Sequence, residues 1–112
     1  MAKQFILYNL KDDVNEEDFE KWVNDFKGPL ISNLNAVKNY TLTKVGGAMK
    51  AEGGPPGPTD SPYRFVGVVD LTSFEDYAKD QETPAYKEDF MPQFMQRVKN
   101  VIILRAEEIF GD

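Results

Sequence analysis

The chain has 112 residues, of which 41% are apolar and 12% aromatic, and this is enough for one domain over residues 1–112 and too little for two. It contains no cysteine and no histidine, which excludes disulfides, zinc–thiolate sites, thiol nucleophiles and all histidine chemistry. Nineteen acidic residues against thirteen basic ones give a net charge of -6, which repels nucleic-acid phosphates. No stretch is apolar enough to cross a membrane. We therefore expect a cytoplasmic protein that binds neither nucleic acid nor a membrane.

The first half of the chain is predicted to form a strand, a helix and a second strand. Residues 3–10 combine high β propensity with apolar character, and Asn15 is a good N-cap for the helix that follows. Proline has no N–H and disfavours a helical residue before it, so Gly28-Pro29 predicts a kink or a break in that helix. Residues 37–45 are predicted to form the second strand. The apolar residues of the helix recur at spacings of three and four: Phe19, Trp22, Val23, Phe26, Leu30 and Leu34.

The second half begins with a segment rich in glycine and proline. Residues 46–63 hold five of the eight glycines and four of the seven prolines, which predicts a long exposed loop, either a lid over a pocket or a disordered insertion. Strand-like residues 64–71 follow, then a short helix capped by Thr72 and a longer one from Thr83-Pro84 that bends or restarts at Pro92. Residues 101–104 begin a last strand, and the predicted order is β-α-β-β-α-β.

The predicted strands are apolar on both faces. Phe5 and Leu7 point to one side of the sheet while Ile6 and Tyr8 point to the other, and strands 64–71 and 101–104 show the same doubling. Two helices can cover only one face, so a partner must cover the other, and a second copy with two-fold symmetry is the simplest partner. The alternative is that the C-terminal tail covers this face.

Two longer motifs carry a family resemblance that spans almost the whole chain. Phe19-Glu20-Lys21-Trp22 leads to Lys27-Gly28-Pro29-Leu30, and Phe74-Glu75-Asp76-Tyr77 leads to Thr83-Pro84-Ala85-Tyr86. With the element order, these motifs resemble the EthD-like branch of the dimeric α+β barrel superfamily, and within it the RedY-like proteins of pigment and other secondary-metabolite pathways. The resemblance implies an α+β, ferredoxin-like βαββαβ fold with an antiparallel four-stranded sheet that pairs with a second copy.

The resemblance also implies a small-molecule-binding protein without a cofactor or metal. Its ligand would be a small apolar, aromatic or polyketide-like metabolite, and relatives of this kind include cofactor-free monooxygenases, cyclases and isomerases. Oxygenation, cyclisation and condensation are therefore the candidate reactions. The alternative is a non-catalytic ligand-binding or stress-associated dimeric scaffold, because a fold by itself does not choose a function. A cavity of a few hundred Å³ beside Trp22 would favour the first interpretation, and a packed helix–sheet interface the second.

The resemblance places a pocket between sheet and helices, and polar and aromatic groups aimed there are the candidate site residues. The catalytic candidates are Asn9, Tyr40 and Asp70. The ligand-binding candidates are Tyr8, Asn9, Trp22, Tyr40, Arg64, Tyr86 and Arg105.

Each candidate also has a structural interpretation. Trp22 on an apolar stripe is typical of core packing, a buried Asn9 needs partners in any case, and Arg64, Arg105 and Asp70 are the kind of charges that pair at strand ends. EthD-like members place histidine before Gly-Pro where this chain has Lys27, and a lysine acts as a base only if burial lowers its pKa strongly.

Overall fold

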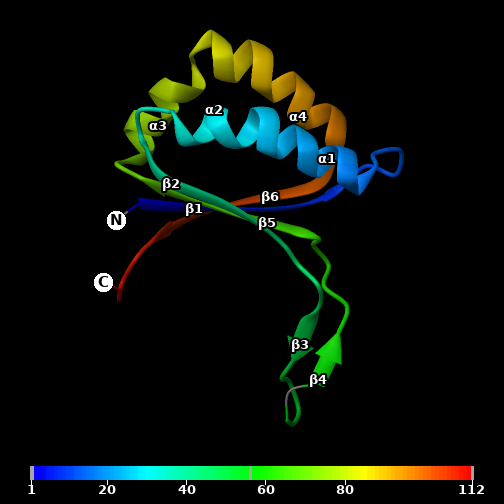
Figure 1. Ribbon diagram of the computed structural model, residues 1–112. Helices are drawn as coiled ribbons and strands as arrows, with labels where there is room; N and C mark the ends of the chain where they lie inside the picture. Colours follow the sequence, from blue (N-terminus) through cyan, green and yellow to red (C-terminus); the bar gives the residue numbers. More distant parts are fainter. Residues whose placement is uncertain (1, 56, 112) are drawn as a thin grey trace.

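The computed structural model describes residues 2–55 and 57–111. Within these residues, six strands, four α-helices and two π-helical turns, labelled η, follow one another (Figure 1). In order, they are β1 (Ala2–Leu10), α1 (Glu16–Trp22), η1 (Val23–Lys27), α2 (Gly28–Ser32), β2 (Val37–Lys44), β3 (Ala48–Lys50), β4 (Gly57–Thr59), β5 (Phe65–Leu71), α3 (Phe74–Gln81), η2 (Ala85–Phe90), α4 (Met91–Arg97) and β6 (Val98–Glu107).

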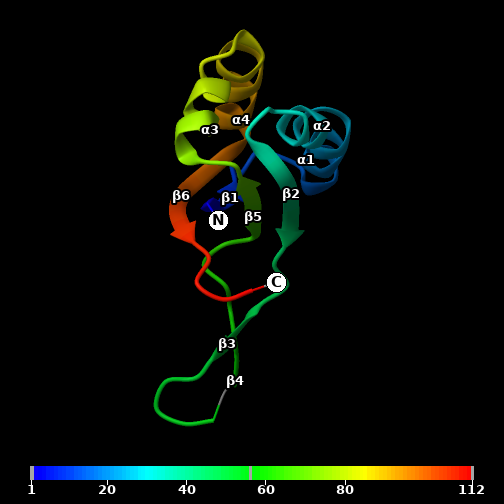
Figure 2. The same cartoon turned by 90° about the vertical axis from the view of Figure 1, so that its left-hand side faces the viewer.

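Four strands form one antiparallel sheet in the order β2-β5-β1-β6. The two helical regions lie side by side on one face of this sheet, and α1 to α2 cover the β2 side while α3 to α4 cover the β6 side (Figures 1 and 2). The predicted α+β class and the ferredoxin-like βαββαβ order are confirmed.

In each helical region a π-helical turn, η1 or η2, comes directly before the helix that contains the proline, Pro29 in α2 and Pro92 in α4. The N–H of Gly28 bonds to the carbonyl of Val23, and the N–H of Met91 bonds to the carbonyl of Tyr86, five residues back in both cases. Of the predicted kink or break at Gly28-Pro29, a break does not occur, because the wider turn accommodates the missing proline N–H and helical backbone continues into α2. The cap of the second region also differs, because Ser73, not Thr72, accepts the N–H of Asp76. The predicted Asn15 cap is confirmed by its bond from the N–H of Asp18.

The sheet has one face under the helices and one bare face. Tyr8, Phe65, Val69 and Leu71 are buried below the helices. The bare face carries the apolar side chains that alternate with these along β1, β5 and β6, and Ile102 and Leu104 are 40% and 50% exposed. The C-terminal tail does not cover them, since Ile109 and Phe110 are almost fully exposed. The bare face is formed by Phe5, Leu7, Val66, Val68, Ile102 and Leu104.

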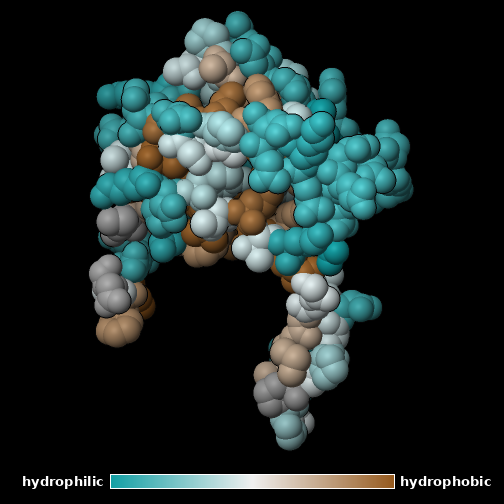
Figure 3. Space-filling model, in the orientation of Figure 1, coloured by the Kyte–Doolittle hydropathy of each residue, from teal (hydrophilic) through white to brown (hydrophobic). Residues whose placement is uncertain are grey.

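The described part of residues 46–63 is largely exposed, as predicted, but it contains two short strands that the composition does not predict. β3 pairs with β4 in a small antiparallel hairpin that projects from the sheet on the side opposite the helices (Figure 1). The segment after β6 projects on the same side, and hydrophobic surface follows the lower border of the body between the two projections (Figure 3). The hairpin therefore borders the bare face and is not a lid over the helical side.

No helix among residues 2–55 and 57–111 has the length and apolar character that a membrane crossing requires.

Candidate functional site

Lys27 is the most unusual side chain of the core. It is the last residue of η1, and only 3% of its surface is exposed. A lysine is almost never buried to this degree without a paired anion. The π-helical turn that accommodates Pro29 sets the direction of this residue, so the backbone adjustment at the proline and the burial of the amine are one local feature.

The Lys27 amine lies among aromatic rings. Its Nζ donates to the hydroxyl of Tyr8 at 2.9 Å and lies 4.6 Å from the ring centre of Phe94, 5.0 Å from that of Tyr8 and 5.6 Å from that of Tyr40. None of the ion pairs among the described residues includes Lys27. The amine is thus held by one neutral hydroxyl and three ring faces.

This environment changes the proton affinity of the groups around it. Burial lowers the pKa of Lys27 to about 7, because the ammonium form loses its hydration without gaining a carboxylate. Burial raises the pKa of the Tyr8 and Tyr40 hydroxyls far above the usual value, so both stay neutral. Near neutral pH, Lys27 therefore exchanges between an amine and an ammonium beside two phenols that keep their protons.

Lys27 lines a cavity of about 70 Å³ between the sheet and both helical regions. Gln4, Tyr40 and Gln81 supply polar groups, and the Tyr40 hydroxyl has no hydrogen-bond partner within the described part of the chain. Ile103 lies in the wall and is 55% exposed, so the cavity meets solvent on the β6 side. The remaining lining residues are mainly apolar: Ile6, Ile31, Val69, Tyr77, Tyr86, Phe90, Met91 and Phe94.

Two of the residues expected at a ligand site, Tyr8 and Tyr40, face this amine, and a third, Tyr86, lines the same cavity. Tyr40 and Tyr86 line the cavity, and Tyr8 touches Lys27 from β1. The Tyr86 hydroxyl accepts a hydrogen bond from the Gln81 side chain at 3.3 Å. The cavity is several times smaller than the few hundred Å³ considered above, and Trp22 does not line it.

Trp22 and Asn9 hold parts of the fold together. The indole N–H of Trp22 donates to Gln93 at 3.0 Å, and its ring stacks on Phe90, so Trp22 joins the two helical regions. The Asn9 side chain accepts the N–H of Arg64 and donates to the carbonyl of Pro62. Asn9 therefore fastens the base of the hairpin and lies outside the cavity.

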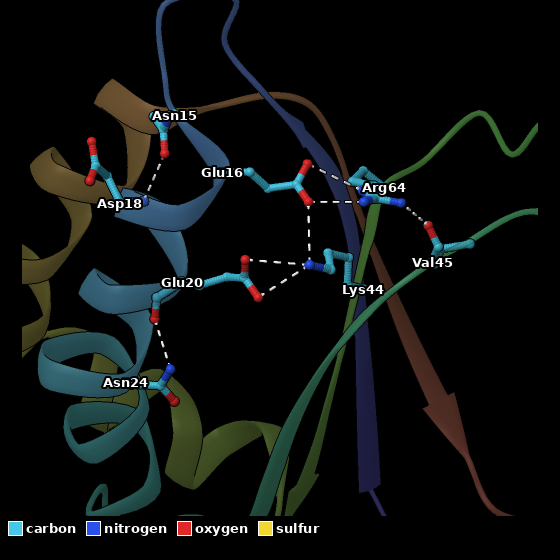
Figure 4. Close-up of polar contacts among 8 residues, drawn as sticks. All are labelled: Asn15, Glu16, Asp18, Glu20, Asn24, Lys44, Val45 and Arg64. Atoms are coloured by element: carbon cyan, nitrogen blue, oxygen red, sulfur yellow. Dashed lines mark hydrogen bonds and ion pairs between the residues drawn. The ribbon is translucent and has the colours of Figure 1, made fainter.

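The charged candidates also lie elsewhere. Arg64 forms a two-point contact with Glu16 and donates to the carbonyl of Val45, within a network that joins α1 to the ends of β2 and β5 (Figure 4). Asp70 pairs with Lys3 at 3.2 Å. Arg105 stacks on the Phe74 ring, 4.9 Å from its centre.

Lys27, Gln4 and Gln81 line the cavity but are not among the candidate site residues predicted from the sequence. The available signal was the place of Lys27 four residues after Val23 and three before Leu30, next to the apolar stripe of the helix. No cluster of acidic residues suited to a metal ion occurs among the described residues.

Gly28 is required by the turn that sets Lys27. A Cβ on this residue would lie 2.9 Å from the carbonyl oxygen of Val23, which is backbone and cannot rotate away. We expect Gly28→Ala to lower the free energy of unfolding by about 1–2 kcal/mol, although alanine favours helix over glycine by about 1 kcal/mol. Urea denaturation measures this change. Gly46→Ala is the control, since nothing lies within 4 Å of its added Cβ; equal stability of the two variants would contradict the assignment.

Comparison with known proteins places this geometry in a family. The model of the REDY-like protein HapK matches residues 2–109. The crystal structure of HapK from Hahella chejuensis is similar over 100% of this chain and 96% of its own, with a TM-score of 0.77 and 19% identity. A comparison with the curated proteins gave no match.

Two further solved structures are similar at the level of the fold. One is a dimeric ferredoxin-like protein of unknown function from Thermobifida fusca, with 17% identity, a TM-score of 0.68 and coverage of 94% of this chain and 88% of that one. The other is a hydroxynitrile lyase from Passiflora edulis, with 15% identity, a TM-score of 0.73 and coverage of 98% and 96%. These likenesses agree with the sheet order, and the family match extends over nearly the whole chain. The chain belongs to the REDY-like HapK family.

Proposed function

We propose that the chain is a homodimer in which each protomer binds a small, largely apolar metabolite in the Lys27 cavity and transfers a proton without a cofactor. The observation that carries this proposal is the Lys27 amine, which is buried, lacks a carboxylate partner within the described structure and faces a cavity. A base whose pKa lies near the working pH is the most effective kind for proton transfer.

The dimer is supported by the bare face of the sheet. In a single protomer Ile102 and Leu104 are exposed and the other apolar side chains of this face are half-buried, and the similar Thermobifida fusca protein is a dimeric one. Pairing through this face leaves the helical side and its cavity free in both protomers. The hairpin and the C-terminal segment would then flank the partner.

Proton transfer can be tested on a simple carbon acid. We expect the protein to accelerate exchange of the methylene protons of 2-butanone in deuterium oxide, followed by proton NMR, and Lys27→Met to reduce the rate by about 100-fold or more. The wild-type rate should rise with pH, reach half of its maximum near pH 7 and level off about one pH unit higher, because only the neutral amine accepts a proton. Tyr8 and Tyr40, which face the amine, remain protonated over this range.

Lys87→Met is the matched control. Lys87 is exposed and pairs with Glu82 on the surface, so its replacement should leave the exchange rate unchanged. Exchange that is equally fast in Lys27→Met and the wild type would reject the catalytic role.

The second candidate is a binding scaffold without chemistry, and the small size of the cavity favours it. Saturable shifts of protein NMR signals with butanone, without any exchange beyond the buffer rate, would establish the scaffold instead.

A further inference from the structure

We propose that Lys27 is a nucleophile and forms a Schiff base with the carbonyl group of a small aldehyde or ketone. This inference rests on the proposed function, because it requires the Lys27 cavity to be the ligand site. It assigns the substrate class, a carbonyl compound, and a covalent intermediate to a residue so far described as a base.

The amine meets the first requirement of such a reaction, which is a free lone pair. An ammonium held by a carboxylate is not nucleophilic, but Lys27 contacts only the Tyr8 hydroxyl and ring faces within the described structure. Desolvation in an apolar pocket is an established way to activate a lysine amine. Burial alone lowers the pKa of Lys27 to about 7, so the neutral form is abundant near pH 8.

The rings around the amine also suit the product. Attack forms a bond from Nζ to the carbonyl carbon while the C=O π electrons move to oxygen, and a proton passes from nitrogen to that oxygen. The carbinolamine hydroxyl then takes up one proton from solvent and leaves as water, while the C–O bond breaks and the nitrogen lone pair forms the C=N bond. The resulting iminium carries its positive charge at the same place as the ammonium, facing Phe94, Tyr8 and Tyr40.

Tyr8 is placed to assist the loss of water. Its oxygen accepts from Nζ at 2.9 Å, so its own O–H proton is available to a hydroxyl on the carbon attached to Nζ. Tyr8 stays protonated because burial raises its pKa. The Tyr8 O–H can therefore donate a hydrogen bond to the departing oxygen, and no other protein group is required for this step.

The size of the cavity limits the substrate. A dry cavity of about 150 Å³ holds benzene, and this one encloses about 70 Å³. Only a short aliphatic carbonyl compound fits beside the amine. The alkyl chain of a longer compound would have to extend into solvent past Ile103, the exposed residue of the cavity wall. Small aliphatic aldehydes should therefore react before aromatic ones.

The experiment is reductive trapping with propanal as the probe. Native protein at pH 8 is treated with propanal and borohydride, and intact mass spectrometry followed by peptide mapping locates the reduced propyl group. We expect one propyl group per protomer, on Lys27, with faster labelling by propanal than by benzaldehyde. Lys87→Met should label like the wild type, Lys27→Arg should lose the specific label, and Tyr8→Phe should slow it by at least about 10-fold.

Peptide mapping of the propyl label on the wild-type protein tests the Schiff base even if a variant folds poorly. Labels spread evenly over the exposed lysines, with none preferred at Lys27, would overturn the inference. If Lys27-dependent butanone exchange is present without a propyl group on Lys27, the nucleophile is rejected and the base stands. If both exchange and label are absent, the proposed function fails as well.

Discussion

Lys27→Met should remove most of the pH dependence of stability between pH 7 and 9. In the wild type the lysine pKa falls from 10.5 in the unfolded chain to about 7 in the folded one. The unfolded state therefore binds more protons in this interval, and the free energy of unfolding rises with pH, by about 2 kcal/mol from pH 7 to 9. Below pH 7 both states are protonated and the penalty for burying the charge is complete.

The test is urea denaturation followed by the fluorescence of Trp22, the one tryptophan, at several pH values and equal protein concentration. The absence of histidine and cysteine leaves no other side chain that ordinarily titrates in this interval. Lys87→Met should follow the wild-type curve. If Lys27→Met and the wild type show the same slope, the amine is not desolvated, and both proposals for Lys27 lose their basis.

Val68→Glu should separate the proposed dimer into monomers. Val68 lies opposite Phe5 of β1 and Thr41 of β2, in the middle of the bare face. A carboxylate there would be buried without a partner, and near a two-fold axis it would approach its own copy. We expect dimer affinity to fall by at least about 100-fold, since an unpaired buried charge costs about 3–5 kcal/mol.

Sedimentation velocity across micromolar concentrations measures this loss. Met95→Glu is the control, because Met95 is 51% exposed on α4, on the helical side of the molecule. It should leave the assembly unchanged. A wild-type protein that sediments as a monomer, or a Val68→Glu dimer as strong as the wild type, would refute pairing through this face.

The sheet was predictable because its signals are local. Period-two alternation places Phe5 and Ile6 on opposite faces whatever the rest of the chain does, and the Asn15 cap depends on residues within one turn. Local signals could not decide whether Thr72 or Ser73 caps the helix, because both carry a suitable hydroxyl. The path of the backbone decides which hydroxyl reaches the free N–H of Asp76.

The site was less predictable because it depends on tertiary packing. A proline in a helix can give a break or a wider turn, and packing on the sheet decides between them at Pro29. Lys27 is buried at the end of the wider turn, and the sequence alone could not establish that burial, so the lysine was not among the predicted site residues. The hairpin of β3 and β4 was missed for a similar reason: glycine and proline suggest irregular backbone, and cross-strand pairing outweighs their low propensity.

The two π-helical turns give the cavity a direction. Lys27 and Phe90 hold the same place in the two βαβ halves, each two residues before a proline, and both line the cavity. The first half therefore places an amine in the cavity wall, and the second half places an aromatic ring there at the matching position. A guest with a polar end and an apolar end would have a single preferred orientation, head toward η1 and tail toward η2.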